Sequence, residues 1–182
     1  MPFILRKIRK ARWRGSEVIG WLSSDDLQAD ALVDLATKDN RLSVYIVATD
    51  RFNLERILAA LAGNCDFISN LDYVLLEENA LDEINIKIAS VKGETPDEEV
   101  NAVHRDLVEL SATQILALAK LFSTRGERNR LTGRRVLELL ARAVDSGQIE
   151  RDRLKVKPEE IAKIDAFITK NTSSPEAPDN PL

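Results

Sequence analysis

The side chains best suited to chemistry in this chain are basic, and they gather in two stretches. The first fourteen residues hold six cations and no acid, with a tryptophan among them: Arg6, Lys7, Arg9, Lys10, Arg12, Trp13 and Arg14. A second stretch surrounds the start of an expected helix and holds Arg125, Arg128, Arg130, Arg134 and Arg135. Cations interleaved with an aromatic are typical of nucleic-acid-binding segments, and helix N-termini favour phosphate. Both stretches are therefore candidates for binding a polyanion.

Three carboxylates spaced four residues apart form an acidic counterpart. Asp26, Asp30 and Asp34 lie on a predicted helix that begins at Ser23 or Ser24 and continues to about Ala36, so one helix face would carry all three. Like charges at this spacing repel one another. The row is then a docking face for a basic partner or for the chain's own basic residues, or a solvated outer face. A divalent-metal site is the third interpretation, although one helix offers no closed oxygen cage.

Catalytic patterns are scarce. The tetrapeptide His104-Arg105-Asp106-Leu107 matches the start of a protein-kinase catalytic loop, but Ser111 stands where that loop needs a magnesium-binding asparagine. Nucleophile-elbow, phosphate-loop and dinucleotide-binding patterns do not occur. His104 is expected to be a partly buried structural residue, with a general base as the alternative. Because His104 and Cys65 are each the only residue of their kind, a Cys/His zinc cage is excluded. We therefore expect no enzyme activity, no cofactor and no metal.

Composition indicates a folded chain with segregated charge. Of the 182 residues, 44% are hydrophobic and 31% are charged, which is typical of globular proteins. The net charge of -4 arises from +6 over residues 1–14, -12 over 15–124, +5 over 125–157 and -3 over 158–182. Such segregation steers charged partners. Alternatively, the basic residues at the start lie on the chain's own acidic body or on a second copy.

The single cysteine favours a reducing compartment. Cys65 cannot form an intrachain disulfide, so we expect the cytoplasm. No secretory signal pattern follows the basic start, and no stretch approaches the roughly 18 apolar residues of a membrane span. We therefore expect no membrane partner.

Strand patterns are concentrated in the first ninety residues. Alternation of apolar and polar residues predicts a strand over residues 42–48 and another near 84–91. Residues 71–76 fit either a strand or a helix, because a short apolar run does not distinguish them. Phe3–Leu5 and Val18–Ile19 would add edge strands.

Helical spacing dominates the remainder of the chain. It predicts helices over residues 54–61, 95–110, 111–122 and 133–146, and one that begins at Pro158. Gly63 is expected to end its helix in a left-handed conformation, and Gly147 to end another. Capping boxes are expected at Thr95 with Glu98 and at Ser111 with Gln114. Residues 123–132 are expected to form a polar, basic loop.

The combined expectation is an α+β protein that is predominantly helical, with a small N-terminal sheet and a helical C-terminal half. It divides into a basic arm (residues 1–14), an acidic α+β body (15–124), a basic helical segment (125–170) and a disordered tail (171–182). In the basic segment, the order helix, basic loop, helix and Gly147-Gln148-Ile149 resembles a winged helix–turn–helix. That resemblance implies a second helix that reads DNA.

Function is expected to be non-catalytic. The first hypothesis is a cytoplasmic regulatory protein that docks a protein partner, or a second copy of itself, through opposed basic and acidic surfaces. The alternative is a nucleic-acid-binding regulator that uses the basic arm and the region from Arg125 to Arg135. The two hypotheses differ in where the basic stretches lie. They either pair with acidic residues of the chain itself or of a second copy, or lie together on a free surface.

Overall fold

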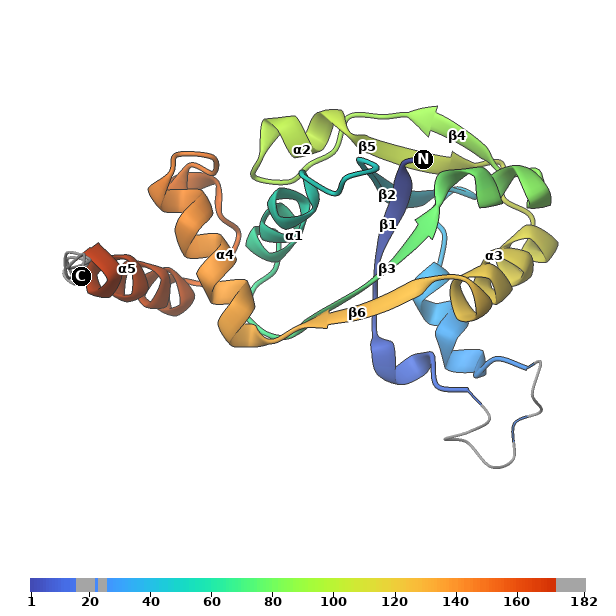
Figure 1. Ribbon diagram of the computed structural model, residues 1–182, viewed down its shortest axis with the longest axis horizontal. Coiled ribbons are helices and arrows are strands. Elements are labelled where there is room, and N and C mark those ends of the chain that lie inside the picture. The colour runs from blue at the N-terminus through green and yellow to red at the C-terminus, as the bar shows by residue number, and fades with distance from the viewer. Residues whose placement is uncertain (16–21, 23–25, 173–182) are drawn as a thin grey trace, which may run out of the picture.

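A computed structural model describes residues 1–15, 22 and 26–172. Within them, one antiparallel sheet has six strands in the order β4-β5-β2-β1-β3-β6 (Figure 1). The strands are β1 (Phe3–Ile8), β2 (Leu42–Val47), β3 (Leu71–Glu77), β4 (Lys87–Ser90), β5 (His104–Val108) and β6 (Glu127–Leu131). The expectation of a predominantly helical chain with a small N-terminal sheet is wrong. The fold is mixed α/β, and its sheet takes strands from both halves of the chain.

Five α-helices and four 3-10 helices accompany the sheet in the described residues. The α-helices are α1 (Leu54–Gly63), α2 (Glu98–Ala102), α3 (Ala112–Thr124), α4 (Gly133–Asp145) and α5 (Pro158–Thr172). The 3-10 helices are η1 (Lys10–Arg12), η2 (Ala29–Leu35), η3 (Glu78–Ile84) and η4 (Arg151–Arg153).

Each face of the sheet is covered by a separate hydrophobic core. On one face, α1 and α4 pack on the sheet and α5 packs on α4; on the other face lie α3, η2 and η3 (Figure 1). The neighbouring residues Ile4 and Leu5 point to opposite faces, and both are fully buried. Successive side chains of a strand alternate between faces, so a strand buried on both sides lacks the alternation of apolar and polar residues that marks a half-buried strand.

This double burial explains two results for the strands. Phe3–Leu5 was expected at an edge, but β1 lies inside the sheet, hydrogen-bonded to β2 on one side and β3 on the other. The ambiguous residues 71–76 belong to β3, in which six of seven residues are buried. The strand expected near 84–91 is the shorter β4, and the one over 42–48 is confirmed as β2.

The predicted helix over residues 95–110 is wrong. Asp97, rather than Thr95, caps a short α2 by accepting the amides of Glu99 and Val100, and the chain then enters β5. Val100 and Leu107 were assigned to one apolar stripe, yet they lie in the cores on opposite faces of the sheet. Helical spacing was therefore coincidental at this place.

The expected basic loop over residues 123–132 contains β6, an edge strand paired with β3. The helices on its two sides, α3 and α4, lie on opposite faces of the sheet. They do not pack against each other as a helix–turn–helix requires, so the resemblance to a winged helix–turn–helix does not hold in the structure.

Several other local predictions are correct. The Ser111–Gln114 capping box at α3, the helices α1, α4 and α5, and the end of α4 just before Gly147 are confirmed. Gly147 adopts the left-handed conformation, with φ 74°. Gly63 does not adopt a left-handed conformation and is the last residue of α1. A Cβ there would lie 2.9 Å from Leu154 Cδ2, so close packing favours glycine. Val18–Ile19 and residues 173–182 of the expected tail lie outside the described residues.

Candidate functional site

The basic arm begins inside the sheet and then turns across its end. Two carboxylates fix this turn through consecutive amides: Arg9 N–H donates to Asp34 Oδ2 at 2.7 Å, and Lys10 N–H donates to Asp72 Oδ2 at 2.8 Å. Asp34 lies in the last turn of η2 and Asp72 lies on β3, so two distant segments hold the arm. The arm is thus attached to the rest of the fold at Arg9 and Lys10.

Asp34 is the main internal partner of the arm. Its Oδ1 accepts from Arg12 Nη1 at 2.9 Å, and its Oδ2 accepts from Trp13 Nε1 at 2.8 Å. The Asp34 carbonyl oxygen accepts from the guanidinium of Arg6 at 3.0 and 3.3 Å. Part of the arm is therefore held on the chain's own acidic body, as one of the two interpretations of the charge pattern expected.

The row Asp26, Asp30 and Asp34 does not form one face. Residues 29–35 form a 3-10 helix, which has three residues per turn, so a spacing of four places successive carboxylates on different sides. Asp26 precedes this helix, and both Asp26 and Asp30 are exposed. Of the three, only Asp34 contacts the arm.

Trp13 is a core residue. It is 3% exposed, and its ring packs against Phe122 of α3 with centroids 5.9 Å apart. Its indole N–H is already bonded to Asp34. Trp13 is therefore not free to stack on a base.

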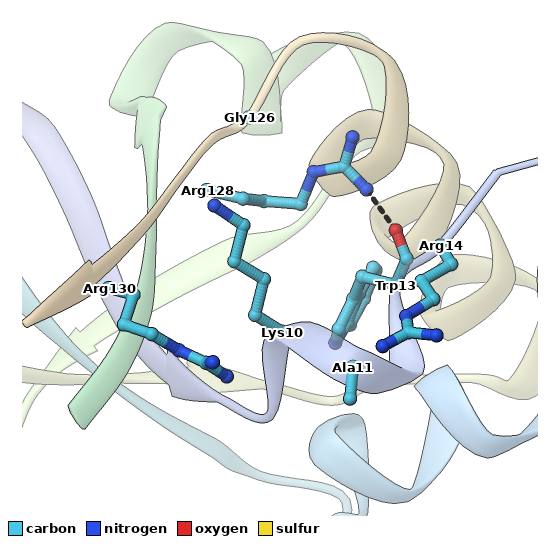
Figure 2. A pocket seen from close by; sticks show the side chains of 7 residues that line it. All are labelled: Lys10, Ala11, Trp13, Arg14, Gly126, Arg128 and Arg130. Carbon is cyan, nitrogen blue, oxygen red and sulfur yellow. Dashed lines mark hydrogen bonds between the residues drawn. The ribbon is translucent and has the colours of Figure 1, made fainter. Parts of the chain in front are cut away.

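Lys10 and Arg14 of the arm meet β6 in an open groove of about 540 Å³, here called the basic groove. Figure 2 shows the side chains that line it: Lys10, Ala11, Trp13, Arg14, Gly126, Arg128 and Arg130. Arg128 and Arg130 are two residues apart on β6, so their side chains point to the same face of the strand. The structure thus brings together cations that are more than a hundred residues apart in the sequence.

The four cations of the basic groove differ in their partners. Arg130 makes a two-point ion pair with the buried Asp72, at 2.6 Å from Nε and 2.8 Å from Nη2. The hydrogen bond from Arg130, together with the Lys10 amide, lowers the pKa of Asp72 below its ordinary value. Arg128 donates to the Trp13 carbonyl oxygen (Figure 2). The side chains of Lys10 and Arg14 make no hydrogen bond or ion pair with the described residues, although the charge of Lys10 also helps to lower the pKa of Asp72. The groove therefore keeps a positive charge.

The other predicted arginines lie elsewhere. Arg125 pairs with Glu83 at 2.7 Å beyond the end of α3. Arg134 and Arg135 lie on α4, where both contact Glu138 and Arg135 also reaches Glu55 at 2.6 Å. Of the five arginines in this stretch, only Arg128 and Arg130 line the basic groove.

His104 is buried on β5, where its Nδ1 lies 3.0 Å from the Val91 carbonyl oxygen. Its Nε2 is 3.7 Å from Asp106 Oδ1, and that same oxygen accepts from the Ser43 hydroxyl at 3.1 Å. A nucleophilic serine needs a direct hydrogen bond to its base. Here the aspartate stands between the two, so these residues do not form that pair.

Asp72 is the functional residue that sequence reasoning missed. It is the one acid in the apolar run Leu71–Leu76. A buried carboxylate needs charged or hydrogen-bonding partners, so an acid in a buried strand is a signal that basic residues lie nearby. The sequence does not show, however, that these basic residues are Lys10 and Arg130.

Within the residues that the structure describes, no helix is long and apolar enough to cross a membrane, and no cluster of acidic, histidine or cysteine side chains could hold a metal ion. The search for similar proteins found no matching family model, curated protein or solved structure.

Proposed function

We propose that this chain is a non-catalytic regulator that binds the phosphate backbone of a nucleic-acid duplex in the basic groove. The observation that carries the proposal is the meeting of Lys10 and Arg14 from the arm with Arg128 and Arg130 from β6. Phosphate neutralisation by lysine and arginine supplies most of the non-specific affinity of proteins for nucleic acid. The fold presents these cations on a fixed frame, because buried acids hold the arm.

The lining of the basic groove favours nucleic acid over an acidic protein. Protein interfaces draw most of their affinity from aromatic and apolar anchors that become desolvated. The one aromatic residue that lines the groove, Trp13, is already buried and hydrogen-bonded. Interfaces with nucleic acid are more polar and far more positively charged, and this groove has that character.

The acidic half of the opposed-surface hypothesis has less support. Asp34 is occupied by the arm, and Asp26 and Asp30 are not aligned with it. Docking of a protein or of a second copy through that row would need an acidic face that the 3-10 helix does not build.

Duplex is the preferred form of the ligand. Proteins that bind single strands combine cations with aromatic platforms on which bases stack. An exposed aromatic is missing from the groove lining, so contacts fall on phosphates and binding is independent of base sequence. The free thiol of Cys65 fits a reducing compartment, and we propose the cytoplasm as the place of action.

The test is the salt dependence of binding to a labelled duplex of mixed sequence, measured by fluorescence anisotropy with the full chain. With three to four groove cations engaged, log K should fall with log salt at a slope of about -3. A second duplex of different sequence should bind equally well. Light scattering after size exclusion at low salt tests the rival hypothesis. A salt-sensitive dimer with no duplex binding would overturn the proposal in favour of self-docking.

A further inference from the structure

Asp72 lies at the junction of the two segments that build the basic groove. β3 is paired with β1 on one side and with β6 on the other (Figure 1). Asp72 stands opposite Ile8 in the first pair and opposite Arg130 in the second. Ile8 is the last residue of β1, and the arm turns directly after it. Asp72 is therefore a neighbour of both the base of the arm and the strand that lines the groove.

The side chains of Asp72 and Arg130 lie on the face of the sheet where the groove opens. Residues directly opposite each other on antiparallel strands project to the same side, so these two side chains meet. Ile8, Val74 and Trp13 belong to the core on that face, and Trp13 also lines the groove. The contacts of Asp72 and the lining of the groove thus share one side of the sheet.

Two groove cations converge on the Asp72 carboxylate. Its Oδ2 accepts from the Lys10 backbone amide at 2.8 Å, which fixes the point from which the Lys10 side chain enters the groove (Figure 2). Both oxygens accept from the Arg130 guanidinium. The hydrogen bond from Arg130 is the main cause of the lowered pKa of Asp72, and the charges of Arg130 and Lys10 add to it. One carboxylate between two cations leaves one positive charge uncompensated.

Arg130 can bind Asp72 and a further anion at the same time. Its side chain is 46% exposed, whereas that of Asp72 is 10% exposed. A guanidinium carries five N–H donors in a rigid plane, and Asp72 occupies only the edge formed by Nε and Nη2. Nη1 makes no hydrogen bond with the described residues. The outer edge of the guanidinium is therefore free to donate to a phosphate in the groove.

A carboxylate beside such cations can act in two opposite ways. It can take the place of a phosphate and compete with it, or it can orient the cations for the phosphate. Competition requires the carboxylate to withdraw when the ligand arrives. Asp72 is buried on a strand that is paired on both sides, and its Oδ2 holds the backbone of Lys10. Withdrawal would break the attachment of the arm, so the contacts favour orientation.

We propose that Asp72 is the positioning residue of the basic groove and orients Arg130 and Lys10 towards a phosphate of the bound duplex. This inference rests on the proposed function, because it assigns a role to an acid within the same site. It has a consequence that net charge alone does not predict. Removing a negative charge beside the groove weakens the binding of a polyanion, whereas a purely coulombic effect has the opposite sign.

The first test is Asp72→Asn in the full chain, measured by fluorescence anisotropy with the mixed-sequence duplex over a salt series. The variant should bind the duplex about three- to tenfold more weakly than wild type, because the charge-assisted hydrogen bonds that orient Arg130 are reduced. The magnitude of the salt slope should also fall by about 1. A merely structural role would lower the folded fraction, which circular dichroism measures under the same conditions, and would leave the slope unchanged.

Arg130→Lys is the second variant, and it preserves the charge of the groove. A lysine ammonium cannot span a carboxylate and a phosphate with a planar fork, so binding should weaken although the net charge is the same. Asp30→Asn is the matched control for Asp72→Asn. It removes the same charge from an exposed residue of η2 and should not weaken binding.

Two outcomes would overturn the role of Asp72. Tighter binding of Asp72→Asn would show that the carboxylate competes with the phosphate. Affinities and slopes equal to wild type in both Asp72→Asn and Arg130→Lys would show that it takes no part in binding. In either case wild type still binds the duplex, so the proposed function stands. A wild-type chain that binds no duplex would overturn the proposed function itself, and the role of Asp72 with it.

Discussion

Asp34 and Asp72 accept the backbone amides of two consecutive residues, Arg9 and Lys10, at 2.7 and 2.8 Å. One carboxylate comes from η2 and the other from β3, and both follow the arm in the sequence. Asp34 also forms an ion pair with Arg12 of the arm, and Asp72 forms one with Arg130 of β6. Four other cations of the arm form no ion pair with a carboxylate of the described residues and can bind an anion: Lys7, Arg9, Lys10 and Arg14.

Removing the charge of Asp34 should release the arm. In Asp34→Asn, the side chain keeps one acceptor oxygen and carries an NH2 donor in place of the other. Either Arg12, or Trp13 and the Arg9 amide, therefore loses its acceptor. We expect a loss of about 1–3 kcal/mol in unfolding free energy and faster trypsin cleavage after Arg9 and Arg12. Limited proteolysis with mass spectrometry measures the cleavage.

Asp30→Asn is the matched control for the arm, because Asp30 is an exposed acid on the same 3-10 helix. It should leave the trypsin pattern unchanged. Equal protection of the arm in wild type and Asp34→Asn would contradict the role of Asp34 as its anchor.

Asp72 should make stability depend on pH in the acid range. Its pKa is lowered in the folded state, chiefly by the hydrogen bond from Arg130. Its contribution is therefore complete above the unfolded-state pKa of about 3.9 and disappears as pH falls through the lower folded-state pKa. Asp72→Asn should be less stable than wild type by about 1–3 kcal/mol at pH 7.

The difference between wild type and Asp72→Asn should shrink between pH 5 and pH 2, because a protonated Asp72 resembles the neutral variant. Urea unfolding across this pH range measures it, with Asp30→Asn as a reference for losing an exposed acid. A difference that stays constant down to pH 2 would show that Asp72 acts through packing rather than through its charge.

The elements predicted correctly show a clear local period in the sequence. β2 alternates between apolar and polar residues, and α4 carries a single apolar stripe that includes Val136 and Leu140, so local period was sufficient. β1 and β3 are buried on both faces and carry no such period. β5 and β6 are short and rich in charge, and only their pairing with β2 and β3 makes them strands.

The sequence predicted which type of residue forms the candidate site, but not which of these residues lie together. Charge alone marked the basic arm and the region of Arg125 to Arg135. Which cations remain free depends on contacts over long sequence distances, such as Arg130 with Asp72 and Arg12 with Asp34. Trp13 was grouped with the binding residues because it lies among cations, whereas its ring completes the core beside Phe122.

The basic groove gives a quantitative prediction for duplex binding. Lys10→Gln and Arg14→Gln should each weaken binding to every duplex sequence and reduce the magnitude of the salt slope by about 1. Lys170→Gln, which removes an exposed cation on α5, is the matched control and should change neither quantity. Fluorescence anisotropy over a salt series measures both. Slopes that stay equal to wild type in both groove variants would place the duplex elsewhere.

Gly126 should be required for the position of β6 and hence of Arg128. A Cβ at this residue would lie 2.5 Å from the Phe122 carbonyl oxygen and 2.6 Å from Val74 Cγ2, so the backbone between α3 and β6 would have to move. Gly126→Ala should lower the unfolding free energy by about 1–3 kcal/mol and weaken duplex binding as well. Gly133→Ala, where the nearest atoms lie 3.6 Å away, adds the same methyl group in open contact. It should be close to neutral in urea unfolding and in duplex affinity, and a Gly126→Ala protein that matches it in both would show that the turn into β6 is not tightly packed.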